Sequence, residues 1–233
     1  MTMGLDVKAG GDTDTGTAAA RAEMINMPFL KTAFDKVMVL LAVITLSPLL
    51  VLIALAIKIN GRLHPEDQGP VFYKEARVSQ DRVFYLCKFR VIKSTVLKAA
   101  RLEKGYDHAK PMEGHEGSMT RVGSWLQHRY LDELPQLFNV LKGDMSLVGP
   151  RPWPVPMYEK EIARGIYRKR LLRPGLTGLV QAHKDEQAAL GGGRALDEAY
   201  IEACRALGPV RLLLFDLRVM ADTFRVLAKG QGL

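Results

Sequence analysis

The feature that most constrains this chain is an uncharged apolar run near its N-terminal end. Residues 37–57 form VMVLLAVITLSPLLVLIALAI, which is 21 residues without a charge, between Lys36 and Lys58. As an α-helix the run would be roughly 32 Å long, about the thickness of a bilayer's hydrocarbon core. It is too long and starts too late for a cleaved signal peptide, and a buried helix of a soluble protein normally keeps a polar stripe. We therefore predict a membrane helix over residues 29–60.

The dipeptide Ser47-Pro48 lies at the middle of this run. Proline removes a backbone donor and kinks a helix, and in lipid the carbonyl that it frees needs another partner, for which the Ser47 hydroxyl is close by. Two topologies follow, a kinked span or a helix that bends and returns to the side it entered. Basic residues flank both ends, so the positive-inside rule favours neither end outside, which mildly supports re-entry: Arg21, Lys31 and Lys36 before, and Lys58 and Arg62 after.

Composition excludes several classes of protein. The 233 residues are 48% hydrophobic and carry 33 basic against 25 acidic side chains, a net charge of +8. This composition excludes a disordered or collagen-like chain. The two cysteines, Cys87 and Cys204, form no CxxC pair, so neither a zinc knuckle nor a disulfide framework is expected. The basic excess predicts anionic partners, and beside a membrane helix we favour lipid head groups or phosphorylated substrates over nucleic acid.

The remaining sequence predicts an α+β fold that is mostly helical. We expect a disordered tail over residues 1–28, where Asp12-Thr13-Asp14 spells DxD but follows no strand, and a folded domain over 61–233. β-prone runs around Ser79-Gln80-Asp81 predict a small β-hairpin. Helical patterns cover four further segments: 122–142, 158–172, 195–207 and 210–229.

Two basic groups leave alternatives open. Arg211, Arg218 and Arg225 recur every seven residues on one face of the last predicted helix. That face is either the solvated side of a helix packed on the core or a surface helix on an anionic membrane. The cluster Arg168-Lys169-Arg170 with Arg173 is similarly either surface charge or a contact to phosphates and head groups.

The densest group of chemically capable residues surrounds Asp132 and Glu133. Pro135 is tolerated only in a first helical turn, so the helix should begin near Asp132 and the two carboxylates should lie at its N-terminus. They could simply cap the helix, or one could act as a nucleophile while the next holds Mg²⁺ or a proton. Adjacent side chains diverge on a helix, so a glycosidase pair, whose carboxyls face each other, is a poor fit.

Cations could support these carboxylates from two places. Lys88-Phe89-Arg90 follows the predicted hairpin, and Arg151 lies in the stiff loop Gly149-Pro150-Arg151-Pro152, suited to bidentate phosphate contacts. The chain contains no Walker loop, GxGxxG, HExxH or GxSxG motif, so P-loop hydrolysis, hydride transfer, zinc proteolysis and α/β-hydrolase chemistry have no support.

In their order these motifs resemble the bacterial sugar transferase family, the small monotopic polyprenyl-phosphate phosphoglycosyl transferases that start exopolysaccharide assembly. The resemblance covers about residues 30–228. It rests on the central Ser-Pro together with Gly69-Pro70-Val71-Phe72-Tyr73, Lys88-Phe89-Arg90, Leu131-Asp132-Glu133-Leu134-Pro135-Gln136-Leu137, Gly143-Asp144-Met145-Ser146, Gly149-Pro150-Arg151-Pro152 and Arg173-Pro174-Gly175-Leu176-Thr177-Gly178.

The resemblance implies transfer of a phospho-sugar from a UDP-sugar to polyprenyl (undecaprenyl) phosphate, with release of UMP, at the cytoplasmic face of the inner membrane. It implies that Asp132 is the nucleophile, that Glu133 assists through Mg²⁺ or a proton, and that both carboxylates hold the metal. The substrate-binding residues would be Lys88, Arg90, Asp144, Arg151 and Arg173. It also favours re-entry at Ser47-Pro48 and makes residues 61–233 a cytosolic catalytic domain with membrane-surface helices. In this arrangement the Asp132 carboxylate lies at the start of a short helix beside the lipid surface and is not buried in the interior.

The chain departs from the family pattern at two places. Gln127 stands where many relatives have an arginine, and Lys184-Asp185 replaces the usual continuation after the Thr-Gly motif; Arg129 or Lys184 could substitute. A second hypothesis is a membrane-anchored scaffold that keeps the fold without turnover. The donor sugar, the glycan pathway and the oligomeric state, a homodimer included, are not determined by the sequence.

Overall fold

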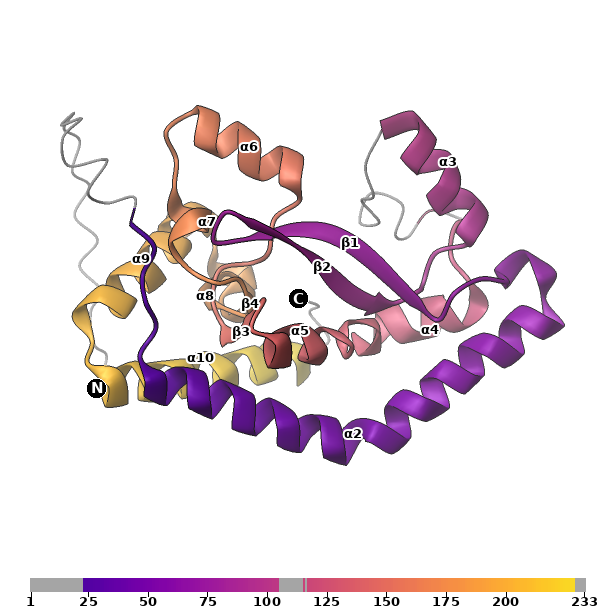
Figure 1. Ribbon diagram of the computed structural model, residues 1–233, viewed down its shortest axis with the longest axis horizontal. Helices are drawn as coiled ribbons and strands as arrows, with labels where there is room; N and C mark the ends of the chain where they lie inside the picture. The colour runs from indigo at the N-terminus through magenta and orange to yellow at the C-terminus, as the bar shows by residue number, and fades with distance from the viewer. Residues whose placement is uncertain (1–22, 105–114, 116, 229–233) are drawn as a thin grey trace.

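A long helix runs along one side of the protein, and the other elements lie on the same side of this helix (Figure 1). The computed structural model describes residues 23–104, 115 and 117–228, so the Asp12-Thr13-Asp14 motif lies outside the described residues. In chain order the elements are α2 (Phe29–Leu63), the 3₁₀ turn η1 (Pro65–Asp67), β1 (Phe72–Ser79), β2 (Arg82–Phe89), α3 (Ser94–Lys104), α4 (Arg121–His128), the 3₁₀ turn η3 (Leu131–Glu133), α5 (Gln136–Lys142), β3 (Ser146–Val148), α6 (Val155–Ala163), α7 (Arg168–Leu171), β4 (Gly175–Thr177), α8 (Leu179–Ala182), the 3₁₀ turn η4 (Lys184–Glu186), α9 (Gly192–Ala206) and α10 (Pro209–Ala228).

Helix α2 is continuous through Pro48 and bends near its middle (Figure 1). Pro48 has no N–H to donate to the carbonyl of Ile44, one turn earlier, and the Ser47 hydroxyl donates to that carbonyl instead, at 2.8 Å. The predicted partner for the freed carbonyl is therefore confirmed. The helix ends at Leu63, a little beyond the predicted end at residue 60.

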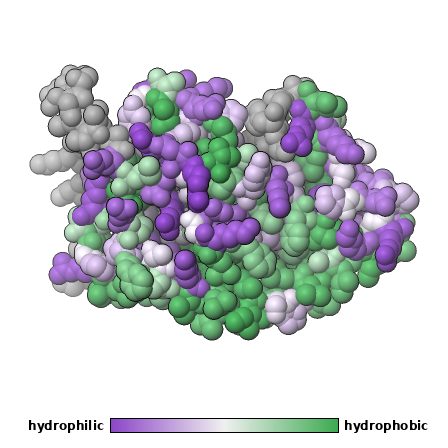
Figure 2. Space-filling model, in the orientation of Figure 1, coloured by the Kyte–Doolittle hydropathy of each residue, from purple (hydrophilic) through white to green (hydrophobic). Residues whose placement is uncertain are grey.

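One side of α2 is an exposed apolar surface. Among the described residues α2 is the one helix long and apolar enough to cross a membrane. In Figure 2 this surface forms the hydrophobic lower edge of the molecule. Helix α10 packs beside α2 and adds exposed apolar side chains of its own. The large exposed apolar residues of the two helices are Phe29, Leu30, Val37, Met38, Leu40, Leu41, Ile44, Val51, Leu52, Leu55, Ile59 and Leu63 on α2, and Val210, Leu214, Leu217 and Phe224 on α10.

The predicted hairpin is confirmed and is longer than the β-prone runs. Strands β1 and β2 pair antiparallel from Phe72 with Phe89 to Ser79 with Arg82. The two turn residues, Gln80 and Asp81, both have positive φ, as a type I′ turn requires. Asp81 is held by the Tyr158 hydroxyl and by Arg170 at 2.5 Å, which stabilise a turn that contains no glycine.

A second, parallel pair of strands was not predicted. Strand β3 pairs with β4, with Ser146 opposite Gly175 and Val148 opposite Thr177. Gly149 follows β3 where a side chain would collide with the backbone, because an added Cβ would lie 2.6 Å from the carbonyl oxygen of Arg173. The two short strands therefore lie close enough to fix the direction of the proline-rich loop after β3.

Two predicted helices are each broken in two. The pattern over 122–142 forms α4, η3 and α5, because Tyr130 has a left-handed φ of 56° and Pro135 then begins the α5 helix. Asp132 therefore lies in a 3₁₀ turn before α5 rather than at the first residue of an α-helix. The pattern over 158–172 divides into α6 and α7 at Gly165, whose φ is 72°. Helices α9 and α10 match their predictions closely.

The expected boundary of the N-terminal tail is also different. Within the predicted tail the structure describes residues 23–28, and there the Ile25 N–H donates to the Leu171 carbonyl at 2.8 Å. Ile25 and Met27 pack against the main core. The residues directly before α2 therefore belong to the folded body.

A buried polar network joins the start of α2 to the rest of the fold. The Lys31 ammonium lies 2.5 Å from Asp216 of α10 and 3.7 Å from Asp35, and it donates to the Val148 carbonyl at 3.4 Å. Asp35 accepts from the Ser146 hydroxyl, and Tyr200 of α9 donates to Asp216 at 2.8 Å. Burial raises the pKa of Asp216, and the attraction of Lys31 opposes this shift. A single ammonium thus connects α2, α10 and β3.

We predict that Lys31→Met lowers the free energy of unfolding by about 3–5 kcal/mol, because it leaves two buried carboxylates without their cation. Arg225→Met is the control, since its ion pair with Asp222 is exposed and should contribute no more than about 1 kcal/mol. Chemical denaturation of both variants in detergent measures the difference. Equal losses for the two variants would contradict the role given to Lys31.

Candidate active site

The Asp132-Glu133 pair lies in η3, between the hairpin and the second half of α2. The flanking residues Leu131 and Leu134 pack into the hydrophobic cluster that contains Ile53 and Ile57 of α2. The same cluster contains Phe89, Val91, Ile92 and Leu126, so the turn shares one apolar cluster with α2, β2 and α4. The pair is thereby positioned by apolar contacts on either side of the two carboxylates.

Lys88 of β2 is the cation next to both carboxylates. Its ammonium donates to Glu133 at 2.7 Å and lies 4.0 Å from the nearer oxygen of Asp132. The Asp132 side chain is only 6% exposed, less than Lys88 or Glu133. The prediction that this carboxylate is not buried is therefore wrong, since the Asp132 side chain is buried beside Lys88.

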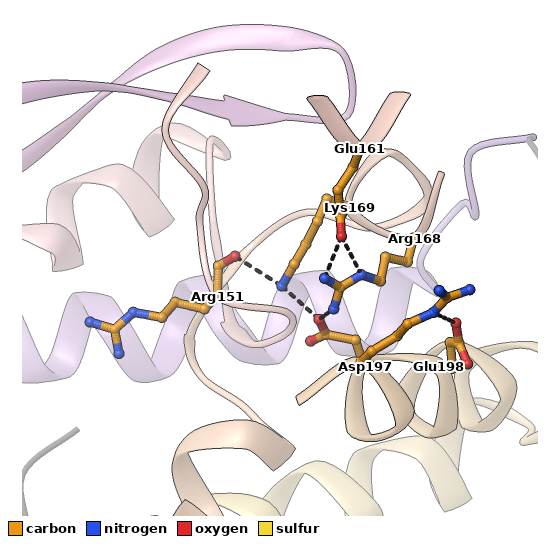
Figure 3. Close-up of polar contacts among 7 residues, drawn as sticks. Arg151, Glu161, Arg168, Lys169, Asp197 and Glu198 are labelled. Atoms are coloured by element: carbon orange, nitrogen blue, oxygen red, sulfur yellow. Dashed lines mark hydrogen bonds and ion pairs between the residues drawn. The ribbon is translucent and has the colours of Figure 1, made fainter. Parts of the chain in front are cut away.

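Glu133 is held in its ionised form by its surroundings. Burial raises the pKa of this carboxyl, but the charges of Lys88 and Arg151 and the hydrogen bonds from Lys88 and Gln136 outweigh it, so the pKa is below its usual value. Arg151, whose charge contributes to lowering this pKa, belongs to the proline-rich loop after β3. Figure 3 shows the Arg151 side chain extending away from the ion-pair cluster that holds its backbone.

The site therefore unites two adjacent carboxylates with cations from two other elements. Asp132 and Glu133 come from η3, Lys88 from the hairpin and Arg151 from the loop after β3. An arrangement of this kind suits the binding of a phosphate group beside an anionic side chain, because the cations offset the charge of both.

The chain matches the model of the bacterial sugar transferase family over residues 26–230. The chain belongs to the bacterial sugar transferase family. It is 32% identical to the exopolysaccharide production protein ExoY of Sinorhizobium fredii, over 87% of each chain. It is 36% identical to the undecaprenyl-phosphate glucose phosphotransferase of Komagataeibacter xylinus, over 65% of this chain and 27% of that relative.

A third relative is the UDP-N-acetylgalactosamine-undecaprenyl-phosphate N-acetylgalactosaminephosphotransferase of Aeromonas hydrophila. It is 36% identical over 66% of this chain and 34% of its own length. The chain thus matches about a third or less of the first curated relatives.

The Arg90 side chain is bound elsewhere in the fold and makes no recorded contact with Asp132 or Glu133. It is buried, and the guanidinium donates to the carbonyls of Pro70 at 2.8 Å, Ile92 at 2.9 Å and Asp67 at 2.7 Å. The predicted substrate contact of Arg90 is therefore contradicted by its burial. The side chain instead joins η1, the start of β1 and the segment after β2.

Asp144 and Arg173 have other surroundings as well. Asp144 pairs with Arg82 at 2.9 Å, and its carbonyl accepts from Ser79 at 2.7 Å, so it stabilises the turn end of the hairpin. Arg173 lines a small hollow beside the first turns of α2, together with Lys31, Lys36 and Ser146. The recorded contacts bring neither residue to Asp132, and their predicted roles stay predictions.

The basic cluster at 168–170 also has structural partners. Arg168 and Lys169 pair with Asp197 at 2.5 and 2.7 Å, and Arg170 pairs with Asp81. The interpretation as a head-group contact does not fit Lys169, which is buried, or Arg168, whose guanidinium is enclosed by two carboxylates. Of the two suggested substitutes for the family's arginine, Arg129 stacks on Trp125 at 4.6 Å and Lys184 lines a separate hollow with Arg225.

The structure adds residues that the sequence analysis missed. Glu75 and Arg77 form a buried ion pair at 2.8 Å on β1. Their register places them on the same face of the hairpin as Lys88, because Tyr73 pairs with Lys88 and side chains alternate along a strand. In the sequence this shared face was indicated by the spacing of Tyr73, Glu75 and Arg77 at every second position.

The donor set fits magnesium only together with a substrate. Among residues 23–104, 115 and 117–228, no three His, Cys, Asp or Glu side chains gather as a metal site of their own. Mg²⁺ commonly binds one or two carboxylates and completes its shell with waters and substrate phosphates. Asp132 and Glu133 could supply those carboxylates to an ion that arrives with a diphosphate.

Arg90→Lys should lower the free energy of unfolding by about 2–4 kcal/mol, because one ammonium cannot reach all three carbonyls that the guanidinium binds. Arg218→Lys, at an exposed position on α10, is the matched control and should change little. Denaturation curves of the two variants measure the effect. An unchanged midpoint for Arg90→Lys would contradict the structural role of Arg90.

Proposed function

We propose that this chain transfers a phospho-sugar from a UDP-sugar to polyprenyl phosphate at the cytoplasmic face of the bacterial inner membrane. The products are polyprenyl-diphosphate-sugar and UMP, and the reaction starts the assembly of an exopolysaccharide or a related glycan. The observation that carries the proposal is the pair Asp132-Glu133 with Lys88 at 4.0 and 2.7 Å, in a member of the bacterial sugar transferase family. The names of the relatives support the substrate class.

In the first step an oxygen of the Asp132 carboxylate attacks the sugar-linked phosphorus of the donor. A phosphorus–oxygen bond forms, the bond to the bridging oxygen breaks, and UMP leaves with that oxygen. In the second step an oxygen of polyprenyl phosphate attacks the same phosphorus and releases Asp132. Two like-charged substrates then never need to meet, because the enzyme carries the phospho-sugar between them.

The cations around the pair offset the charge that this chemistry gathers. Lys88 and Arg151 already stabilise the ionised Glu133, and both are placed to attract a diphosphate. In our proposal the incoming diphosphate competes with Glu133 for Lys88 and draws the ammonium aside. That movement uncovers Asp132, whose carboxylate is otherwise covered.

Magnesium held by Asp132 and Glu133 would offset the charge of the donor's phosphate oxygens. Glu133 stays ionised at neutral pH because its pKa is below the usual value, so it is suited to that task. Asp132, which would supply the nucleophilic oxygen, directly precedes Glu133 in the same turn.

We further propose that α2 enters and leaves the membrane on the cytoplasmic side. The exposed apolar surface of α2, the bend near its middle and the hydrogen bond from Ser47 to Ile44 support this arrangement. The flanking residues Leu131 and Leu134 pack into the apolar cluster that includes Ile53 and Ile57 of α2, so the carboxylates would lie near the level of the lipid phosphate. The exposed apolar residues of α10 would lie in the same surface, with anionic lipids facing its arginines.

The alternative function is a membrane-anchored scaffold that has kept the fold without turnover. The covered position of Asp132 is the observation that favours it. The two functions differ in one product, because only the transferase releases UMP from a UDP-sugar in the presence of polyprenyl phosphate.

Asp132→Asn is expected to lower UMP release by roughly three orders of magnitude or more, because an amide cannot attack phosphorus. The assay uses mixed UDP-sugars with polyprenyl phosphate, and membrane association should be unchanged. Glu198→Gln is the control, since Glu198 makes an exposed ion pair with Arg194. Near-normal release by Asp132→Asn would exclude Asp132 as the nucleophile, and no release by the wild type with any donor would favour the scaffold.

A cysteine placed at Met24, just before α2, should resist an impermeant maleimide added outside intact cells. Met24 is 45% exposed, so its inaccessibility would come from the membrane. The experiment uses a chain in which Cys87 and Cys204 are replaced by serine, and permeabilised cells provide the positive control. Labelling of Met24→Cys in intact cells, with the domain after α2 protected, would contradict re-entry and support a span.

A further inference from the structure

The loop that carries Arg151 is held at four consecutive carbonyl groups. The Pro150 carbonyl accepts from the Gly175 N–H at 2.9 Å, and the Trp153 carbonyl accepts from the Val78 N–H at 3.2 Å. Between them, the Arg151 carbonyl accepts from Lys169 at 3.3 Å and the Pro152 carbonyl from Arg77 at 3.5 Å. The two outer contacts come from backbone, so the two inner ones are where side chains fix the loop.

Lys169 makes the inner contact to Arg151 itself. Its side chain is only 7% exposed, and its ammonium lies 2.7 Å from Asp197 of α9 while it donates to the Arg151 carbonyl (Figure 3). Burial lowers the pKa of Lys169, and the charge of Asp197 opposes that shift. The lysine therefore joins the loop to α9 through one buried charge.

The cluster around Lys169 is balanced in charge. Arg168 pairs with the same Asp197 at 2.5 Å and with Glu161 at 2.6 Å, so two cations face two carboxylates. A neutral, buried cluster is a poor site for a phosphate, because both cations are already paired. The cluster must instead act by restraining the parts of the protein that it contacts.

Trp153 is held by the same two cations. The Arg168 guanidinium lies 4.8 Å and the Lys169 ammonium 5.1 Å from the centre of its ring. The cluster thus restrains the loop at the Arg151 carbonyl and at the side chain two residues later. With its backbone fixed on this side, the Arg151 guanidinium extends the other way (Figure 3).

We propose that Lys169, anchored by Asp197, is a positioning residue that presents Arg151 to the phosphate groups of the substrate. The proposal rests on the proposed function for the identity of that substrate. Lys169 makes no contact with the substrate, and it acts by keeping the peptide of Arg151 in one orientation. A misplaced guanidinium would lose the bidentate geometry that phosphate binding uses.

A double-mutant cycle separates this role from a merely structural one. Lys169→Met should lower kcat/KM for the UDP-sugar by about tenfold when Arg151 is present. In the Arg151→Ala background the same change should cost less than about twofold, because the group that Lys169 positions is gone. The proposal would be overturned if the two single-variant losses of kcat/KM multiply in the double variant. It would also be overturned if Lys169→Met alone leaves kcat/KM unchanged.

Two further variants keep the cycle interpretable. Arg194→Met removes a cation from an exposed ion pair on α9 and should leave kcat/KM unchanged in both backgrounds. If Lys169→Met does not fold, Asp197→Asn weakens the same anchor and replaces it in the cycle with the same expected outcome. No effect of Arg151→Ala on its own would refute the assigned role of Arg151 and, with it, this inference, while leaving the transferase activity in place.

A second measurement does not depend on turnover. The chain has two tryptophans, so Trp125→Phe leaves Trp153 as the only tryptophan that reports on the loop. In that background Lys169→Met should increase acrylamide quenching of Trp153 and shift its emission to the red, whereas Arg194→Met should do neither. Unchanged quenching would overturn the proposal even if the chain released UMP, and increased quenching without UMP release would refute the proposed function alone.

Discussion

The buried ammonium of Lys31 connects the long apolar helix α2 to the domain that would carry out the chemistry. It reaches Asp216 of α10 and the Val148 carbonyl at the end of β3. The Tyr200 hydroxyl, which donates to Asp216, also lies 3.1 Å from the same carbonyl, and the next residue, Gly149, donates to Thr177 of β4. The polar network that holds α2 in place therefore also holds the end of β3, where the loop that carries Arg151 begins. A buried ion pair is costly to form, and here it fixes which surfaces of α2 and α10 meet.

From that point the site is assembled by three elements that the sequence keeps far apart. The hairpin brings Lys88, η3 brings the two carboxylates, and the loop after β3 brings Arg151. Leu131 and Leu134, on either side of the carboxylates, pack into the apolar cluster that also contains Ile53 and Ile57 of α2. The fold thus joins a set of opposed charges and the helix with the exposed apolar surface through one apolar cluster, an arrangement consistent with the proposed reaction between a nucleotide sugar and a lipid phosphate.

Local patterns predicted much of this fold. The apolar helix, the hairpin, α9 and α10 each depend on periodicity and turn residues within a single segment, and the Ser47 contact follows from the geometry of proline. Contacts between distant segments were not predictable in the same way. The sequence showed three cations next to one another at 168–170, but only the fold shows that Asp197 and Glu161 enclose two of them. Likewise Lys88 and Arg90 are two residues apart, yet one faces the carboxylates and the other is held by three carbonyls. The burial of Asp132 depends on the contact between β2 and η3, which the sequence of neither segment specifies.

The most direct measurement is the mass of the protein after incubation with a UDP-sugar and Mg²⁺ in the absence of polyprenyl phosphate. The account predicts an adduct with the mass of one phospho-sugar, on the peptide that contains Asp132, and its disappearance when polyprenyl phosphate is added. The absence of any adduct under conditions that support turnover, or an adduct on another residue, would contradict transfer through Asp132.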